Sequence, residues 1–523
     1  MISDMRSILS DRHAVWAFAL GCVAVTAGVV LHLPMFLMAR TMHFRLAGMP
    51  MDGAMGSGMA LIVGGVAVAA YGLLPRKLAV AHGDGDVTIA APEDAALSPA
   101  HWGLMLVLVL ALVIDVMKPA SLGFTVPGMA SEYGVPKATV SLVPFFALLG
   151  TVTGSVLWGV IADVYGRKAS ILLSAVMFVG TSICGAMPSL AWNIGMCFMM
   201  GAAAGGMLPV TYALLAEMMP SRHRGWSLVL VGGLGAAGGY FAASAASAVL
   251  QPLFGWRILW LLNLPTGLAL VLLGSFIPES AKFLLARGRT AEAAAVMRRF
   301  GAVARRVVSP VAAAAPHRPV RFTGELIALS IAALAWGFVN FGLLLWLPTD
   351  LIAKGYSVAS SSRLLAQSAL IAFPTVFVAA LLYSRWSTKW SLVATLATTM
   401  LGLCGVLWLE GSGDRSPVLP VALLIIGSNA IIAVLLPYTA ESFRLRMRGR
   451  ATGWVAACTK GGGLLAQGLS IAALVPPMGV VAALILVPAG VALLLVVWFG
   501  RETRGGDLRD LEPPALEPVR RAA

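Results

Sequence analysis

Charged residues are scarce in this chain. Asp, Glu, Lys and Arg together account for 11% of its 523 residues, whereas 59% of the residues are hydrophobic. Soluble domains carry about 25% charged residues, because their surfaces face water. The scarcity of charge therefore excludes a soluble globular protein, and we predict an all-α polytopic membrane protein.

Cysteine is also rare, and the motifs of common enzymes are missing. The five cysteines fall inside apolar runs without CxxC or metal-ligand spacing, which indicates small packing residues. The chain contains no G-x-S-x-G nucleophile turn, no H-E-x-x-H zinc motif and no phosphate-binding G-x-x-x-x-G-K. We therefore expect neither enzyme activity nor a bound metal or other cofactor.

Positive charge exceeds negative charge. The 37 Lys and Arg residues against 23 Asp and Glu give a net charge of +14, which in a soluble chain would suggest a nucleic-acid partner. Here the cations fall in short loops between apolar runs, and no basic face with interleaved aromatic residues is present. We expect no nucleic-acid partner and interpret the cations as residues that orient the chain in a lipid bilayer.

Fourteen apolar runs are long enough to cross a membrane as helices. Two of them, about 14–37 and 56–74, form a leading hairpin ahead of the other twelve. The twelve core spans fall into two groups of six, separated by a long loop. These predicted spans are 103–127, 140–162, 169–187, 191–218, 226–250, 258–277, 324–348, 364–383, 390–409, 418–440, 451–475 and 479–499.

The loops predict domains and an orientation. The loop at 278–323 carries nine Lys and Arg residues, and placing it in the cytoplasm puts both termini there as well. We predict an N-terminal two-helix extension at 1–75, a polar linker at 76–101, a six-helix bundle at 102–280, a central loop at 281–322, a second six-helix bundle at 323–500 and a tail at 501–523.

The stretch GVIADVYGRK lies between the second and third core spans. Its spacing places Gly159, Asp163, Gly166, Arg167 and Lys168 as G-x-x-x-D-x-x-G-R-K, which indicates a tight reversal at the membrane surface. This pattern resembles the signature loop between helices 2 and 3 of the major facilitator superfamily. An ordinary loop on the positive side would explain only the Arg-Lys pair.

Later stretches strengthen the resemblance, especially to the sugar-porter and metabolite:proton symporter branches. Glu217 and Arg224 form E-x6-R-G after the fourth core span, and Glu441 and Arg448 repeat it after the tenth. PES from Pro278 and ETRG from Glu502 follow the sixth and twelfth. The resemblance implies the major facilitator fold, with the two-helix extension added to it. It also implies a conformational gate, in which charge networks hold the outward-facing state closed, formed by Asp163, Arg167, Glu217, Arg224, Glu441 and Arg448.

Two positions depart from the family pattern. Ser384 stands where the second-half signature loop often has Asp, which predicts a one-sided latch. Cys197 stands where many members carry Arg in the fourth helix, so this chain must couple to protons without that residue.

The first core span contains two charges. Asp115 and Lys118 lie about a dozen residues from the cytoplasmic end, near mid-bilayer, where an unpaired charge costs about 3 kcal/mol or more. Their i,i+3 spacing predicts that the carboxylate neutralises the ammonium. We predict that Asp115 carries a proton and that Lys118, when freed, attracts an anionic substrate. A purely structural ion pair is the alternative.

Other polar residues in predicted spans are candidates for the same cavity. They are Asn340, Gln367, Asn429, Lys460 and Gln467. Lys460 either points into the cavity or extends toward the cytoplasmic surface. Four aromatic residues either line a pocket or pack and anchor the helices, namely Tyr240, Trp336, Phe341 and Trp346.

The sequence thus favours a secondary active transporter. We expect it to move a small organic solute, preferably an organic anion, by alternating access in the bacterial inner membrane, as a monomer driven by the proton gradient. Sugar or polyol symport, drug or metabolite antiport and a non-transporting membrane sensor are alternatives. The leading hairpin combines several Met residues with His32 and His43, which suit copper, although Met as apolar filler explains it better.

Overall fold

The computed structural model describes residues 12–74, 87–90, 96–301, 303–306, 322–412, 416–443 and 445–504. The first half of the described chain contains α2 (Arg12–Val30), α3 (Leu33–Met38), η1 (Ala39–Met42), α4 (Gly53–Leu73), β1 (Val87–Ala90), α5 (Pro99–Tyr133), α6 (Lys137–Val140), α7 (Leu142–Tyr165), α8 (Arg167–Gly180), η2 (Thr181–Ala186), α9 (Leu190–Ala204), α10 (Met207–Met218), α11 (Ser221–Phe254), α12 (Ile258–Leu261) and α13 (Asn263–Phe276).

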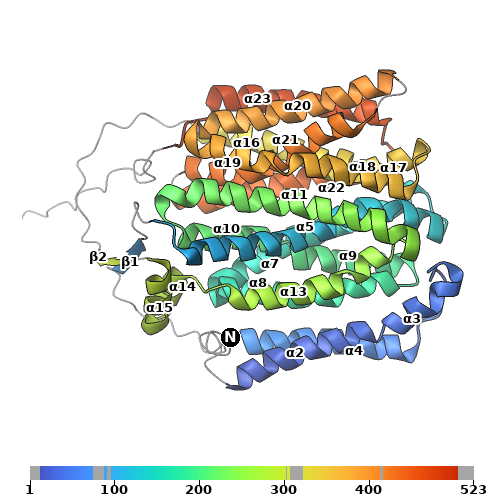
Figure 1. Ribbon diagram of the computed structural model, residues 1–523, viewed down its shortest axis with the longest axis horizontal. Coiled ribbons are helices and arrows are strands. Elements are labelled where there is room, and N and C mark those ends of the chain that lie inside the picture. Colours follow the sequence, from blue (N-terminus) through green and yellow to red (C-terminus); the bar gives the residue numbers. More distant parts are fainter. Residues whose placement is uncertain are drawn as a thin grey trace, which may run out of the picture.

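The remainder contains α14 (Ala281–Ala286), α15 (Thr290–Phe300), β2 (Val303–Arg306), α16 (Phe322–Phe338), η3 (Val339–Leu343), α17 (Leu344–Ala353), α18 (Val358–Ala372), α19 (Thr375–Arg385), α20 (Thr388–Ser412), α21 (Val418–Ser442), α22 (Leu445–Ile471) and α23 (Met478–Phe499). We refer to α5–α13 as the amino-terminal half and to α16–α23 as the carboxy-terminal half. The long helices of both halves run side by side, with α2 and α4 along one flank (Figure 1).

Thirteen helical segments of the described chain are long and apolar enough to span a membrane, against the fourteen runs predicted. The fourteenth is α22, which is helical over 27 residues and contacts α16, α21 and α7. Its sequence includes Lys460 and several arginines, which make it less apolar than the other spans. The polytopic helical architecture is therefore as predicted.

A short β-ribbon adds to the expected helices. β1, from the segment predicted as a linker, pairs antiparallel with β2, so that Val87 lies opposite Arg306. The loop predicted between the halves also contains α14 and α15. The two connecting segments therefore meet at one end of the molecule.

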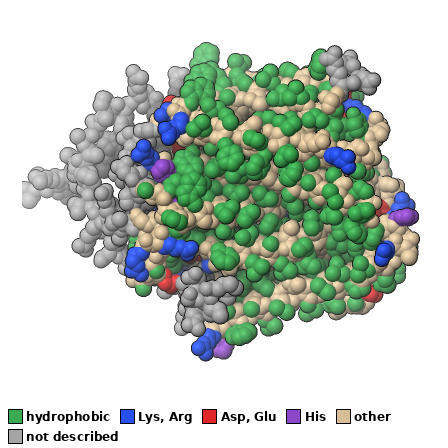
Figure 2. All heavy atoms as spheres, in the orientation of Figure 1, with side chains coloured by type: hydrophobic (Ala, Val, Ile, Leu, Met, Phe, Trp, Pro, Cys, Tyr) green, Lys and Arg blue, Asp and Glu red, His purple; other side chains and the backbone are tan. Residues whose placement is uncertain are grey.

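Charged side chains mark the two ends of the helix bundle. Basic side chains gather toward the ends, and hydrophobic side chains cover the middle (Figure 2). We call the end that carries Gly166, Pro220 and α14 the basic end, which lies on the left of Figure 1. The end that carries Gly134 and Gly355 is called the opposite end. An apolar belt between two polar ends is the surface of a bilayer-spanning protein.

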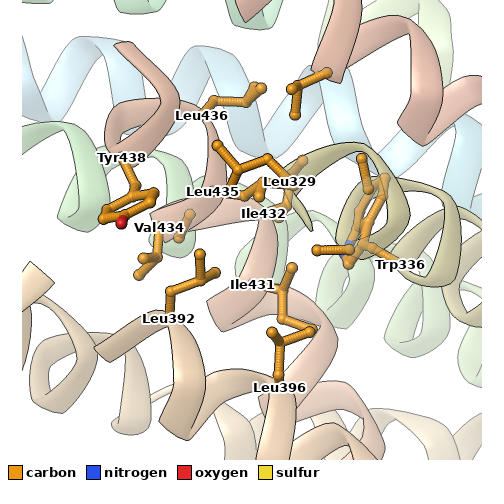
Figure 3. Packing of buried hydrophobic residues seen from close by; sticks show 14 of the residues in the cluster. Leu329, Trp336, Leu392, Leu396, Ile431, Ile432, Val434, Leu435, Leu436 and Tyr438 are labelled. Atoms are coloured by element: carbon orange, nitrogen blue, oxygen red, sulfur yellow. The ribbon is translucent and has the colours of Figure 1, made fainter. Parts of the chain in front are cut away.

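Side chains of the carboxy-terminal half pack into an apolar core around α21. Leu435 and Ile431 on α21 lie among Leu329 on α16 and Leu392 and Leu396 on α20 (Figure 3). All five are nearly inaccessible to solvent. This packing gives the helices of this half a fixed arrangement.

The leading hairpin is held together by small residues. A Cβ added at Gly21 of α2 would lie 2.5 Å from the main-chain nitrogen of Ala69 in α4, and one at Gly28 would lie 2.5 Å from the carbonyl oxygen of Gly58. Close backbone approach of this kind drives helix association in membranes. The hairpin packs on α8, of whose apolar span 94% is buried, against 39% for α20 at the corresponding place in the other half.

Several methionines of the hairpin serve this packing. Met35 and Met55 are buried in the cluster that joins the hairpin to α8, where Val176 and Val179 meet them. Met49 packs against the same cluster. These contacts account for three of the hairpin methionines as apolar filler, whereas Met38 and Met42 are exposed.

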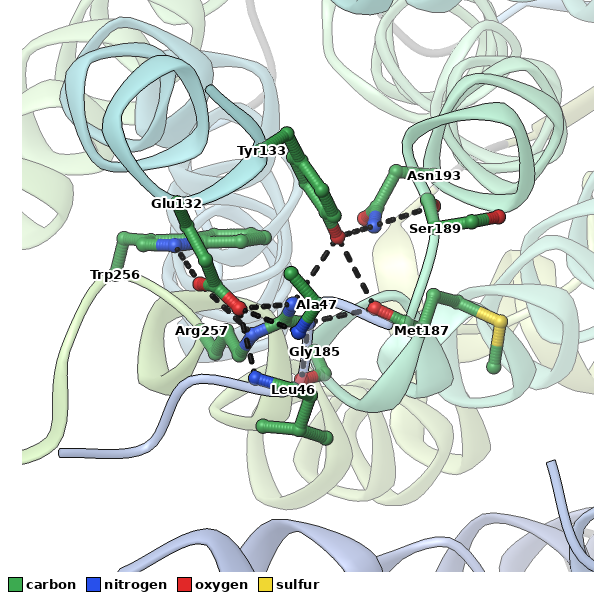
Figure 4. A network of polar contacts seen from close by, with 10 residues as sticks. All are labelled: Leu46, Ala47, Glu132, Tyr133, Gly185, Met187, Ser189, Asn193, Trp256 and Arg257. Atoms are coloured by element: carbon green, nitrogen blue, oxygen red, sulfur yellow. Dashed lines mark hydrogen bonds and ion pairs between the residues drawn. The ribbon is translucent and has the colours of Figure 1, made fainter. Parts of the chain in front are cut away.

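A buried network anchors the hairpin to the amino-terminal half (Figure 4). The carboxylate of Glu132 accepts hydrogen bonds from the main-chain amides of Leu46 and Ala47, at 2.7 and 3.0 Å. It also accepts from Trp256 at 2.8 Å and pairs with Arg257 at 2.7 Å. The Glu132 and Arg257 side chains are 5% and 1% exposed, so this pair depends on complete hydrogen bonding.

Candidate functional site

A cavity of about 560 Å³ lies between the two halves. Its walls come from α5, α7, α9, α10 and α11 on one side and from α16, η3, α17, α21 and α22 on the other. Most of the lining is apolar or aromatic, and the charged residues in it are Asp115, Asp163 and Lys460. A mostly apolar cavity with a few converging polar groups is typical of a small-molecule site.

The structure brings Asp115 and Lys460 to opposite walls of this cavity. Asp115 comes from α5 in the amino-terminal half and Lys460 from α22 in the carboxy-terminal half, and each acts electrostatically on the other. Oδ1 of Asp115 has no hydrogen-bond partner among the described residues. A carboxyl group and an amino group therefore face the same space from the two halves.

Lys118 does not occupy the predicted position. Its Nζ donates hydrogen bonds to the carbonyl oxygen of Phe178, at 3.0 Å, and to the hydroxyl of Thr181, and it lies 3.5 Å from the centre of the Phe178 ring. Within the described part of the chain it forms no ion pair with Asp115 and does not line the cavity. The physical reason is that, where α8 passes into the 3-10 helix η2, the Phe178 carbonyl and the Thr181 hydroxyl both accept from the ammonium.

A π-helical segment presents aromatic and amide groups beside Lys460. Asn340 and Phe341 lie in η3, and Nζ of Lys460 is 4.8 Å from the centre of the Phe341 ring and 6.0 Å from that of Trp336. Nε2 of Gln467 donates to the Phe341 carbonyl at 2.5 Å, and this compensates for the altered hydrogen bonding of the π turn. Such segments are frequent at functional sites.

The other polar candidates divide into two groups. Asn340 and Asn429 line the cavity, and Nδ2 of Asn429 has no hydrogen-bond partner among the described residues. Gln467 is buried behind the lining, and Gln367 is exposed on the outer face of α18, so it was wrongly grouped with the cavity residues. Helical position alone did not tell which face of α18 turns inward.

The aromatic residues divide in the same way. Tyr240, Trp336 and Phe341 line the cavity, and the indole nitrogen of Trp336 donates to the carbonyl of Ser428 at 2.7 Å. Trp346 is instead buried in an apolar cluster to which both halves contribute. Three rings therefore surround the space between the charges.

The fourth core span is broken where it meets the cavity. Helix α9 ends before Gly205, and α10 begins after Gly206. Side chains of α7 satisfy the carbonyls near the break: Ser155 donates to Gly205 at 2.7 Å and Trp158 to Ala202 at 2.6 Å. The paired glycines Gly205 and Gly206 are the sequence signal for this break.

The cavity is closed toward the opposite end and continues toward the basic end. Oγ of Ser141 lies 2.6 Å from Oγ of Ser470, and Oγ of Ser247 lies 2.7 Å from Oγ of Ser362. Each of these pairs joins one half to the other. The lining extends to Asp163, whose side chain is 78% exposed, at the basic end.

The signature loop forms a charge cluster at the basic end. Arg167 pairs with Glu217 at 3.0 Å and with Asp163 at 3.5 Å. Gly166 adopts φ 109°, a conformation that residues other than glycine rarely adopt. Gly159 lies on the cavity wall. These ion pairs lie within the amino-terminal half.

Glu279 completes this cluster and was missed as a site residue. Its carboxylate accepts hydrogen bonds from the main-chain amides of Arg167 and Lys168, at 2.9 and 3.2 Å, and so caps the start of α8. Burial raises the pKa of Glu279 above its ordinary value, and the amide hydrogen bonds partly offset this effect. Nζ of Lys168 donates to the carbonyl of Ser275 at 3.0 Å. The PES motif gave the signal, since an acidic residue suits a helix start.

The carboxy-terminal half repeats the arrangement with other groups. Glu441 accepts hydrogen bonds from Tyr383 at 2.7 Å and Thr503 at 2.9 Å. Glu502 accepts from the Thr388 amide at 2.9 Å and caps α20. Burial alone would raise the pKa of Glu502, but hydrogen bonds led by that from Ser387 lower it.

Two predicted gate residues, Arg224 and Arg448, have less definite positions, and Ser384 stands where the family pattern lacks its usual Asp. A Cβ added at Gly225, next to Arg224, would lie 3.2 Å from a carboxylate oxygen of Glu441, so the first turn of α11 approaches the other half there. Ser384 donates to the carbonyl of Leu381 at 3.1 Å. The side chain of Arg448 lies outside the described residues.

Known proteins resemble this chain over most of its length. The family model described as Major Facilitator Superfamily matches residues 104–466. The niacin transporter NiaP of Acinetobacter baylyi is 27% identical over 440 residues, which cover 80% of this chain and 98% of that protein. The 4-hydroxybenzoate transporter PcaK of Pseudomonas aeruginosa is 35% identical over 204 residues, 38% of this chain and 44% of that protein.

Solved structures share the fold. The proton:xylose symporter XylE bound to 6-bromo-6-deoxy-D-glucose matches with a TM-score of 0.63 and 16% identity, covering 80% of this chain and 99% of that chain. The residues matched by the family model begin after the leading hairpin.

Proposed function

The chain belongs to the major facilitator superfamily, and from this membership we propose that it transports a small aromatic carboxylate together with a proton. It is a membrane transporter of small organic solutes and not an enzyme. The observation that carries the proposal is the position of Lys460, whose ammonium lies at the cavity wall beside the rings of Trp336 and Phe341.

This arrangement suits an aromatic acid. Nζ of Lys460 can pair with a carboxylate, and Trp336, Phe341 and Tyr240 offer ring faces and edges to an aromatic ring. The amides of Asn340 and Asn429 can bond a ring nitrogen or hydroxyl. The named substrates of two relatives, niacin and 4-hydroxybenzoate, each carry a carboxylate on one six-membered aromatic ring.

Proton coupling would use Asp115. While Asp115 is ionised, it attracts Lys460 across the cavity, which competes with a substrate anion. Protonation of Asp115 removes this competition, so that Lys460 binds the substrate carboxylate. Loss of the proton restores the attraction and favours release. In this scheme Lys460 takes the role first expected of Lys118.

We also propose the orientation of the chain. The basic end faces the cytoplasm, because cations are retained on that side. Residue 12, where α2 begins, and Arg504 lie at this end, so both termini are cytoplasmic (Figure 1). With the opposite end closed by the Ser141 and Ser470 contact, the cavity is inward-facing. The remaining proposals are residence in the bacterial inner membrane, a monomeric state and the predicted domain boundaries.

Thermal stabilisation of the detergent-purified full chain tests the substrate class. Benzoate, 4-hydroxybenzoate and nicotinate are compared with benzamide, which lacks the charge, with acetate, which lacks the ring, and with xylose. Each ligand is added at pH 5.5 and pH 8. We expect the aromatic acids to raise the melting temperature, more strongly at pH 5.5.

Lys460→Ala is the decisive variant. Loss of a charge-assisted hydrogen bond costs about 1.5–3 kcal/mol, which corresponds to roughly 10- to 100-fold weaker binding. Lys354→Ala is the matched control, because Lys354 lies at the opposite end, where it pairs with Asp350. Equal stabilisation by benzamide and benzoate, or full retention of the effect in Lys460→Ala, would contradict the proposal. Uptake into liposomes then tests transport itself.

A further inference from the structure

A second hollow of about 590 Å³ lies outside the transport cavity, at the basic end. It forms between the first turns of α11 and the last turns of α19, so its two walls belong to different halves. We call it the interhalf groove, and it is defined by Arg222, Trp226, Leu230, Phe377, Leu381, Arg385 and Arg504. None of these residues lines the transport cavity.

Three arginines from three segments meet at the polar edge of the groove. Arg222 begins α11, Arg385 ends α19, and Arg504 follows α23, and all three are exposed. Nη1 of Arg504 donates to the carbonyl of Trp386 at 2.9 Å, which fixes this side chain near the groove. Within the described residues, none of the three forms an ion pair with a carboxylate. The edge is therefore a concentrated positive site.

The deeper wall of the groove is apolar and exposed. Leu381 is 59% exposed and Phe377 is 51% exposed, and both lie in a membrane-spanning segment, where acyl chains can reach them. Leu230 lies eight residues along α11 from Arg222, a rise of about 12 Å. Trp226 stands between these levels and packs against Trp102, with ring centres 5.9 Å apart. The groove thus changes from cationic to aromatic to apolar with depth.

We propose that the interhalf groove binds a phospholipid with an anionic headgroup. The phosphate of the headgroup suits the three arginines, because a guanidinium group binds phosphate oxygens through several donors at once. The acyl chains match the exposed Leu381 and Phe377, and a tryptophan belongs at the level between headgroup and chain. A soluble anion would use the arginines but leave the apolar wall uncovered.

The position of the groove gives the lipid a role. Arg222 belongs to the amino-terminal half, whereas Arg385 and Arg504 belong to the carboxy-terminal half. One headgroup that contacts all three bridges the halves, so the lipid binds best to the conformation that brings these arginines together. Binding therefore stabilises that conformation relative to the other.

The test uses the full-length protein in a mild detergent. Its melting temperature is measured with added phosphatidylglycerol, with phosphatidylcholine of the same acyl chains and with inorganic phosphate. We expect phosphatidylglycerol to raise the melting temperature by on the order of a few degrees more than phosphatidylcholine. Native mass spectrometry should show retained phosphatidylglycerol. The triple variant Arg222→Gln, Arg385→Gln, Arg504→Gln should lose both effects.

A matched triple variant removes the same charge elsewhere. Arg40→Gln, Arg45→Gln and Arg363→Gln alter exposed arginines outside the groove. This control should keep the preference for phosphatidylglycerol. Equal effects of the two lipids on the wild type, equal losses in both triple variants, or full stabilisation by inorganic phosphate alone would each overturn the proposal. If the groove variant does not fold, Arg385→Gln alone replaces it, with Arg363→Gln as its control.

Discussion

The carboxylate of Glu279 accepts a hydrogen bond of 2.9 Å from the main-chain amide of Arg167, and Glu502 stands in the same relationship to Thr388. Each glutamate follows the last span of its half and caps the helix that follows the signature loop or its counterpart. The two halves therefore share an architectural contact that does not require the same loop sequence. The contact requires only the acidic residue and the main-chain amide at the start of the helix that it caps.

Removal of Glu279 should destabilise the amino-terminal half. Glu279→Ala leaves two buried amides at the start of α8 without their acceptor, and we expect a loss of roughly 1–3 kcal/mol. Thermal unfolding in detergent measures it. Glu292→Ala is the control, since Glu292 pairs with Arg289 at a partly exposed site. Equal losses of stability in the two variants would show that the cap stabilises the protein no more than a partly exposed ion pair does.

The Glu502 contact should depend on pH. Hydrogen bonds lower the pKa of this carboxyl below 4.5 in the folded protein, so the folded state favours the ionised form. Its contribution to stability is therefore present above pH 4.5 and is lost as the pH falls through the lowered pKa. Melting temperatures of wild type and Glu502→Gln should differ at pH 7 and converge as the pH falls through the lowered pKa. A constant difference across this range would refute the assignment.

Glu132→Ala should be among the most damaging changes in the chain. It leaves the buried Arg257 without its partner and releases the Leu46 and Ala47 amides, at a cost of about 3–5 kcal/mol. The double variant Glu132→Ala, Arg257→Leu should recover part of the loss, because no unpaired charge remains. Glu410→Ala, which breaks the exposed pair with Lys354, should cost about 1 kcal/mol or less. Thermal unfolding of all three variants decides the point.

Lys118 and Lys460 should separate stability from binding. Lys118→Ala removes hydrogen bonds to Phe178 and Thr181 and should lower the melting temperature while leaving the shift caused by benzoate intact. Lys460→Ala should abolish the shift caused by benzoate while leaving the melting temperature of the ligand-free protein close to that of the wild type. If Lys118→Ala instead abolishes the benzoate shift in protein that remains folded, Lys118 and not Lys460 holds the substrate.

Asp115→Asn should uncouple transport from the proton gradient. The amide keeps the shape of the side chain but cannot exchange a proton, so accumulation against a gradient should fall to background. Exchange of labelled for unlabelled substrate should persist, because it needs no net proton movement. Asp350→Asn, at the opposite end, is the control. Accumulation by Asp115→Asn at the wild-type level would exclude Asp115 as the proton carrier.

The sequence predicted the helices better than the contacts between them. Apolar runs located the spans, and α22, the least apolar of them, contains Lys460, which lines the cavity. Asp115 and Lys118 lie three residues apart in α5, as the predicted ion pair requires, yet no ion pair joins them among the described residues. Local spacing tells which residues share a helix face but not what a neighbouring helix offers to that face.

The sequence by itself determined the membrane environment, the family and the location of the signature loop, because these depend on composition and on motifs within single segments. The tertiary structure alone decided that Lys460 and Asp115 face each other, that Gln367 points outward and that Glu279 caps α8. Each of these relationships joins helices far apart in the chain. Their geometry follows from how whole helices pack, which no single segment encodes.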